Sequence, residues 1–148
     1  MNNAIVPGAT VRGPFTVHND ITKSLEVLVD KHMVVLAVSQ GKAMCVYTGT
    51  FDDGMKHQNL PGFVEISQSQ NELAGWRLTK KFYADTCKLC VVPVALLQAE
   101  GRVSNGFLKT LENRVLSLKG RVVTTAYSAT AEQRITGARR SIRNGECV

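Results

Sequence analysis

The sequence predicts a small, mostly β domain of the α+β class, closed by one amphipathic helix. Two observations support this prediction. Two runs of strand-forming residues, 33–38 and 43–48, flank a four-residue loop that contains Gly41, which is typical of a β-hairpin. After Ser104, a favourable N-cap, apolar residues repeat at helical spacing, and this pattern predicts a helix over about 104–119.

The length and composition fit one folded domain. The chain has 148 residues, of which 44% are hydrophobic and 20% charged, as in ordinary globular proteins and unlike disordered ones. The apolar runs 33–38 and 89–97 are too short to span a membrane. The first residues lack the basic and apolar segments of a secretory signal. We therefore expect a cytoplasmic protein that does not enter a membrane.

Further strand signals lie before and after the hairpin. Residues 10–17 follow a Pro-Gly turn and predict a first strand, while 21–29 fit a strand or a helix, of which we favour the strand. Residues 50–61 predict a long loop, and residues 100–103 break the strand pattern. In the last turn of the helix, Lys119 complements the dipole, and Gly120 is expected to end the helix in the left-handed conformation. Additional strands are expected at 63–66, 78–84, 89–94 and 122–127.

The charge is basic and is concentrated near the C-terminus. The formal charge is +6 and the pI is about 9.4, which favours a polyanionic partner, although many basic proteins bind no nucleic acid. Residues 121–148 contain five arginines and two glutamates. We expect a folded domain over 1–120 and a basic extension over 121–148. The extension is either an electrostatic arm for nucleic acid or a solubilising segment without fixed structure.

The four cysteines do not require a cofactor. Cys87 and Cys90 form a single CxxC motif, which could be half of a zinc site or a redox pair. No second CxxC accompanies it, and the residues that follow favour a strand over the helix that a redox pair usually begins. We therefore favour buried thiols and expect no metal and no cofactor.

Several short motifs follow one another in an order that is similar to one protein family. Val92-Pro93-Val94-Ala95-Leu96-Leu97 and Gly101-Arg102-Val103-Ser104 resemble a "V-P-x-x-L-L" turn and a "G-R-[VLI]-S" motif before a closing helix. Upstream, Pro7-Gly8-Ala9-Thr10-Val11 resembles the opening turn, and Lys31-His32-Met33-Val34-Val35-Leu36 the "R-P-x-L-V-L" strand. Val46-Tyr47-Thr48-Gly49-Thr50 resembles a strand that ends in a functional Thr or Ser. Over residues 7–119 the chain resembles the MazF/PemK-like toxins of toxin–antitoxin systems.

This resemblance implies an SH3-like barrel of about six to seven strands, with residues 1–120 as the barrel domain, that is usually a homodimer. It also implies an endoribonuclease that cleaves single-stranded RNA without a metal, leaves a cyclic phosphate, and binds an acidic antitoxin-like protein. Two alternatives remain open. One is a barrel that has lost catalysis and binds nucleic acid or a protein, and the other is an inhibitor of a protein such as a topoisomerase.

The resemblance also implies the candidate catalytic residues, which are Lys31, His32, Thr48 and Thr50. Lys31-His32 stands where the family has Arg-Pro, so Lys31 would hold the phosphate as a point charge and His32 would act as acid or base. A hairpin brings residues near 32 and 48 to the same end of two paired strands. An ordinary solvated turn at Lys31-His32 and ordinary strand residues at Thr48 and Thr50 are the alternative.

A second group of residues is expected to bind nucleic acid. In the long loop these are Lys56 and His57, which an exposed polar loop explains equally well. In the extension they are Arg139, Arg140 and Arg143. Trp76 favours core or dimer packing over base stacking.

Overall fold

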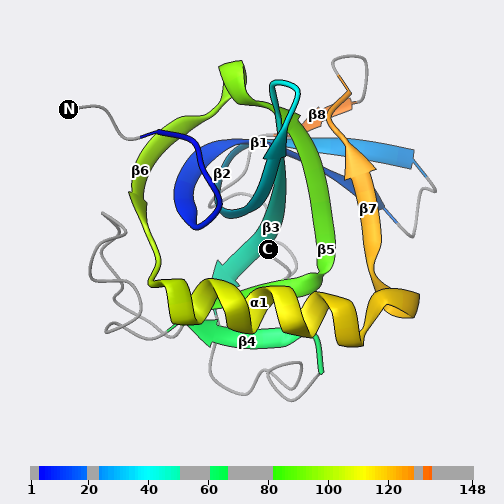
Figure 1. Cartoon of the computed structure of the whole chain (residues 1–148). Helices are drawn as coiled ribbons and strands as arrows, with labels where there is room; N and C mark the ends of the chain where they lie inside the picture. Colours follow the sequence, from blue (N-terminus) through cyan, green and yellow to red (C-terminus); the bar gives the residue numbers. More distant parts are fainter. Residues whose placement is uncertain (1–3, 20–23, 51–60, 67–81, 129–131, 135–148) are drawn as a thin grey trace.

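The computed structural model describes residues 4–19, 24–50, 61–66, 82–128 and 132–134. They form one sheet, one α-helix and short 3-10 helices (Figure 1). The strands are β1 (Ala9–Asn19), β2 (Ser24–Ser39), β3 (Lys42–Thr50), β4 (Phe63–Ile66), β5 (Phe82–Pro93), β6 (Gln98–Arg102), β7 (Val123–Ala126) and β8 (Glu132–Arg134). The helices are η2 (Val94–Leu96), α1 (Asn105–Ser117) and η3 (Lys119–Arg121). No helix in these described ranges is long and apolar enough to cross a membrane.

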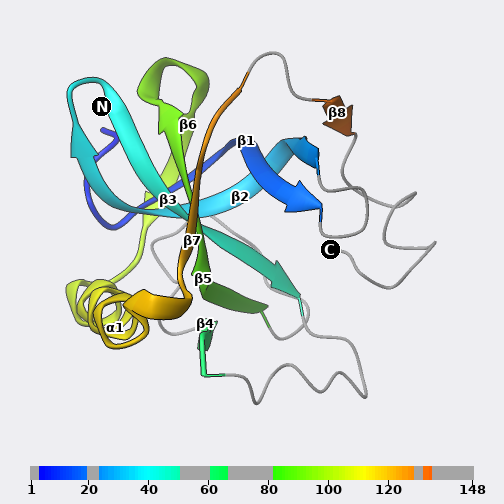
Figure 2. The ribbon, with the colours of Figure 1, turned by 90° about the vertical axis from the view of Figure 1, so that its right-hand side faces the viewer.

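The strands form an eight-stranded sheet in which six follow the order β4-β5-β3-β2-β1-β6, and all of these neighbours are antiparallel. The sheet curls into a half-barrel, and α1 lies across one end of it (Figures 1 and 2). Strand β7 joins β5 and strand β8 joins β2, both in parallel. The predicted fold class, a small mostly β barrel with one closing helix, is confirmed, as is a strand near 122–127.

The predicted hairpin is formed by β2 and β3. Its turn places Gln40 and Gly41 at positive φ values of 53° and 77°, as a tight turn between antiparallel strands requires. Strand β2 is much longer than expected, because β1 pairs with it from Ser24 to Val34. Lys31 and His32 therefore lie in the middle of a strand, and their placement at a strand start was wrong.

Two other predictions on strands are also wrong. The strands expected at 78–84 and 89–94 are one strand, β5, in its described part, because the chain makes an irregularity between Asp85 and Leu89 and continues. The break expected at 100–103 lies largely in β6, since the register against β1 shifts by one residue there. The turn-like sequence thus marks a β-bulge, which a strand can contain.

The closing helix is confirmed, with a different C-terminal end. The Ser104 hydroxyl accepts a hydrogen bond from the Phe107 amide at 3.1 Å, as expected of an N-cap. Gly120 has no positive φ, so the expected left-handed stop was wrong. The helix ends instead at Ser117, and the chain tightens into η3, in which the Arg121 amide donates to the Leu118 carbonyl at 2.7 Å.

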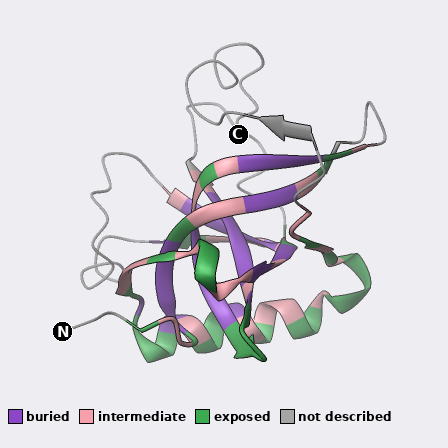
Figure 3. Ribbon diagram, turned by 90° about the horizontal axis from the view of Figure 1, so that it is seen from above, coloured by how far each residue is buried: buried purple, intermediate pink, exposed green. Residues whose placement is uncertain are grey.

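The sheet has a different apolar cluster on each face, and buried residues follow its strands in Figure 3. We call the side covered by α1 the helix face and the other side the opposite face. The helix face packs Val34, Leu36, Val46, Ile66, Ala84, Leu89, Val103, Phe107 and Leu111. The opposite face packs Ala9, Val11, Phe15, Leu28, Met33, Val35, Ala43, Cys45, Tyr47, Cys90 and Val92. Neighbouring residues of a strand therefore enter different clusters, as the pleat dictates.

Candidate active site

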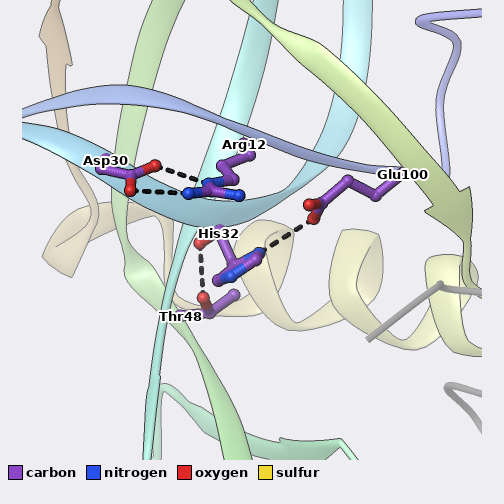
Figure 4. A network of polar contacts seen from close by, with 5 residues as sticks. All are labelled: Arg12, Asp30, His32, Thr48 and Glu100. Atoms are coloured by element: carbon purple, nitrogen blue, oxygen red, sulfur yellow. Dashed lines mark hydrogen bonds and ion pairs between the residues drawn. The ribbon is translucent and has the colours of Figure 1, made fainter. Parts of the chain in front are cut away.

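The pairing of three strands brings polar side chains together on the helix face. In the ladder between β1 and β2, Arg12 lies directly opposite His32. In the ladder between β2 and β3, Met33 lies opposite Tyr47, which brings His32 level with Thr48. Figure 4 shows these residues as one network with Asp30 and Glu100. The site is thus assembled from β1, β2 and β3, and β6 adds Glu100 as the fourth strand.

His32 and Glu100 form the central pair of this network. The ring Nδ1 of His32 lies 2.9 Å from Oε1 of Glu100, and the two side chains are 44% and 18% exposed. Glu100 comes from β6, at the point where the register against β1 shifts. A bulge re-aims side chains, which explains how a residue 68 positions away in sequence reaches the ring. The partly buried carboxylate holds the imidazole in a defined orientation while solvent reaches the ring.

Arg12 and Asp30 form a second, more exposed pair beside the first. Arg12 Nε and Nη2 donate to the two carboxylate oxygens of Asp30 at 2.6 Å and 2.9 Å, which is a bidentate ion pair. The hydrogen bond to Arg12 and its positive charge lower the pKa of Asp30. The hydrogen bond to Asp30 and its negative charge raise the pKa of Arg12. The guanidinium has five N–H donors, of which the ion pair with Asp30 uses two. The ion pair keeps the guanidinium beside His32.

Thr48 is buried, at 1% exposure, and holds the backbone of His32. Its hydroxyl donates to the carbonyl oxygen of His32 at 2.5 Å. This hydrogen bond joins β3 to β2 at the residue that carries the imidazole. The geometry therefore suits Thr48 to positioning His32 rather than to touching a substrate.

Lys31 does not join this group. Its ammonium lies 4.4 Å from the centre of the Tyr47 ring, and Tyr47 belongs to the cluster of the opposite face. Because successive side chains of a strand point to opposite faces, Lys31 and His32 diverge. Of the four expected catalytic residues, the sheet brings together His32 and Thr48 and separates Lys31. The backbone of Thr50 ends β3, and its side chain lies outside the described residues.

The expected nucleic-acid-binding residues lie outside the described residues, as does Trp76. This set comprises Lys56, His57, Arg139, Arg140 and Arg143.

The cysteines of the described residues are unpaired thiols on strands. Cys45 and Cys90 lie opposite each other in the ladder between β3 and β5 and are fully buried. Burial raises the pKa of the Cys45 thiol to about 12. Cys87, which is partly exposed, also has a raised pKa because of its partial burial. Within the ranges that the structure describes, no three His, Cys, Asp or Glu side chains form a group that could hold a metal ion.

Sequence reasoning missed Arg12 and Glu100. Arg12 alternates with Val11 and Gly13 in a strand that was correctly expected, but nothing local shows which strand lies beside it. Glu100 lies in the segment that seemed to break the strand pattern, and that break was the available signal. Glu100 reaches the ring of His32 from a distant strand, so the residues next to His32 in sequence do not indicate it.

The arrangement combines a histidine, a carboxylate on its ring and a permanently charged guanidinium. A histidine titrates near neutral pH and exchanges protons, and a carboxylate on its other nitrogen stabilises the protonated ring. A guanidinium binds phosphate oxygens through a planar set of donors. Together these groups have the chemistry needed for proton transfer next to a phosphate.

Solved structures of other proteins share this fold. One is an endoribonuclease from a mycobacterial species in complex with its cognate antitoxin, with a TM-score of 0.52 and 14% identity over 79% of this chain and 96% of that one. Another is an endoribonuclease from a mycobacterial species, with a TM-score of 0.50 and 13% identity over 81% of this chain and 95% of that one. No protein-family model and no curated protein matches the chain. At these identities the likeness shows the fold.

Proposed function

We propose that the chain is a metal-independent endoribonuclease of the toxin–antitoxin type that cleaves single-stranded RNA. The observation that carries the proposal is the contact of 2.9 Å between His32 and Glu100, with Arg12 opposite His32 on the neighbouring strand. The fold shared with two endoribonucleases supports the same reading. The proposal concerns the helix face of β1, β2 and β6.

The reaction moves one proton from a ribose and breaks one bond to phosphorus. Neutral His32 takes the proton of the 2′-hydroxyl at Nε2, because Nδ1 faces Glu100. The 2′-oxygen attacks the adjacent phosphorus, and the bond from phosphorus to the 5′-oxygen breaks. The 5′-oxygen takes a proton from water, and the hydroxide that this forms takes the proton of the His32 imidazolium, which leaves a 2′,3′-cyclic phosphate, a 5′-hydroxyl and neutral His32. Glu100 stabilises the imidazolium that forms. General-base catalysis by His32 contributes roughly 100-fold or more to the rate.

Arg12 takes the role first expected of Lys31. The phosphorane carries extra negative charge, and a guanidinium within the same network would offset that charge. Asp30 keeps Arg12 against the sheet through its two hydrogen bonds. Thr48 fixes the backbone of His32 and so fixes the position from which the imidazole projects.

Two partners belong to this proposal. One is a second copy of the chain in a homodimer, and the other is an acidic antitoxin-like protein. The formal charge of +6 supports an acidic partner, and one structural neighbour is described as a complex with its cognate antitoxin. Light scattering of the purified protein tests the dimer. Co-expression with a small acidic protein encoded beside the gene tests the second partner.

The decisive experiment is incubation of the purified protein with a long single-stranded RNA, with and without EDTA. We expect cleavage in both samples, fragments that end in a cyclic phosphate, and loss of cleavage in His32→Ala. His18→Ala is the matched control, because His18 is an exposed histidine near the far end of β1. Binding without cleavage would indicate a non-catalytic barrel. If the protein neither binds nor cleaves RNA, the RNA proposal is overturned.

A further inference from the structure

A second surface lies where α1 ends, away from the His32 network. Leu116 and Val123 are 69% and 56% exposed, the most exposed large apolar side chains in the described part of the chain. The first lies on the last turn of α1 and the second begins β7. A single exposed apolar side chain is ordinary, whereas apolar side chains that lie together on a surface mark interaction sites.

The local backbone keeps these residues at one corner of the molecule. The Leu118 amide donates to the carbonyl of Arg114 at 3.1 Å, and the tight turn η3 then leads directly into β7. Figures 1 and 2 both show the end of α1 adjoining the start of β7. We call Leu116, Lys119, Arg121 and Val123 the corner surface.

The corner surface carries positive charge. Lys119 and Arg121 are exposed and lie between its two apolar residues in sequence. Over residues 109–121 the chain has four basic residues and one acidic residue, Glu112. One of the four, Arg114, is committed to the carbonyl of Pro61, to which it donates at 2.6 Å. The exposed lysine and arginine are therefore the charges that this corner presents to a partner.

We propose that the corner surface docks an acidic segment of another protein that carries apolar side chains among its carboxylates. Carboxylates would pair with Lys119 and Arg121, while apolar side chains would cover Leu116 and Val123. A second copy of this chain fits poorly, because two such corners would bring like charges together. RNA would match the charges but leave the two apolar side chains uncovered. The inference rests on the proposed function in one respect, since it names where the acidic partner of that function would bind.

The test uses a synthetic peptide of a few heptads with leucine on one helical face and glutamate on the others, titrated into the full-length protein. We expect saturable binding, with backbone amide shifts in NMR spectra concentrated at residues 114–123. The double variant Lys119→Glu/Arg121→Glu should weaken binding at least roughly tenfold because it reverses the charge. Leu116→Lys should also weaken it roughly tenfold, because it removes the most exposed apolar side chain of the surface.

Matched controls separate the corner surface from general effects. Leu96→Lys changes another exposed apolar residue, at 44% exposure, and Lys42→Glu reverses an exposed charge in the hairpin turn. Both should bind the peptide as the native protein does. Equal weakening by the control and corner variants, or the absence of saturable binding, would overturn the proposal. The proposal would also be overturned if vesicles of phosphatidylglycerol or single-stranded RNA produced the amide shifts at residues 114–123 and the peptide did not.

RNA cleavage provides an independent readout, because none of the varied residues belongs to the His32 network. The corner variants should cleave RNA at the native rate. Cleavage without peptide binding would refute the corner surface and leave the endoribonuclease intact. Peptide binding without RNA cleavage would refute the endoribonuclease and leave the corner surface intact.

Discussion

Strand β2 carries different groups on its two faces, and the difference is clearest at residues 31–33. On the helix face, the His32 side chain is 44% exposed and is held by Glu100. On the opposite face, Met33 is fully buried, and Lys31 lies over the ring of Tyr47. Adjacent residues of one strand thus have unrelated surroundings, because the pleat sends them to opposite sides.

Residues that stabilise the fold and residues proposed to act in chemistry are thus neighbours in sequence that lie on opposite faces of β2. The opposite face contributes burial, which grows with the apolar area removed from water. The helix face around His32 contributes the exposed ion pair of Arg12 and Asp30 and the partly buried contact of His32 and Glu100. An exposed ion pair stabilises a folded protein only slightly. Substitutions on the two faces should therefore be distinguishable by what they change.

The largest stability effect is expected from Met33→Ala. It removes a fully buried side chain, so the free energy of unfolding should fall by about 3 kcal/mol. His32→Ala, one residue away, should change it by less than about 1 kcal/mol, because the side chain is partly exposed. Urea titration followed by circular dichroism measures both values. Similar losses in the two variants would contradict the separation of the faces.

An intermediate effect is expected from Thr48→Val, which keeps the shape of the side chain and removes its hydroxyl. The partly buried carbonyl of His32 then loses this donor, which should cost about 1–2 kcal/mol of unfolding free energy. Thr48→Ser retains the hydroxyl and should restore much of the RNA cleavage rate lost in Thr48→Val. If the two variants cleave RNA equally well, Thr48 does not position His32.

The smallest effect is expected from the exposed pair of Arg12 and Asp30. The pKa of Asp30 is lowered from its ordinary value of 3.8 by Arg12, so its contribution to stability is present above pH 3.8 and is lost as the pH falls below it. The contribution should be less than about 1 kcal/mol because both groups are exposed. Unfolding measured between pH 5 and pH 3 should depend less on pH in Asp30→Asn than in the native protein. An unchanged pH dependence would show that the ion pair does not stabilise the fold.

The parts of the fold that sequence reasoning predicted are those fixed by neighbouring residues. The hairpin needs only its two apolar runs and the turn at Gly41, and the helix needs only its cap at Ser104 and its apolar period. The long course of β2 was not predictable from local signals, because pairing with β1 keeps residues 24–32 extended. Strand β5 was divided in two for a similar reason, since its irregularity looks like a break in the sequence.

The candidate site was predictable to the same extent. His32 and Thr48 were expected together because a hairpin fixes their register, and the sheet does bring them together. Lys31 was grouped with them, although a strand places neighbours on opposite faces once its length is known. Arg12 and Glu100 come from strands whose positions depend on the closure of the whole sheet. Glu100 also lies at a register shift, where alternation no longer shows the direction of a side chain.

The central claim is that His32 and Glu100 act as one unit in RNA cleavage. A double-mutant cycle tests it most directly, with cleavage rates measured at saturating RNA for the native protein, His32→Ala, Glu100→Ala and the double variant. If Glu100 acts through His32, His32→Ala should lose roughly 100-fold or more, and adding Glu100→Ala should lose little further. Native cleavage by His32→Ala, or two losses that multiply in the double variant, would contradict the account.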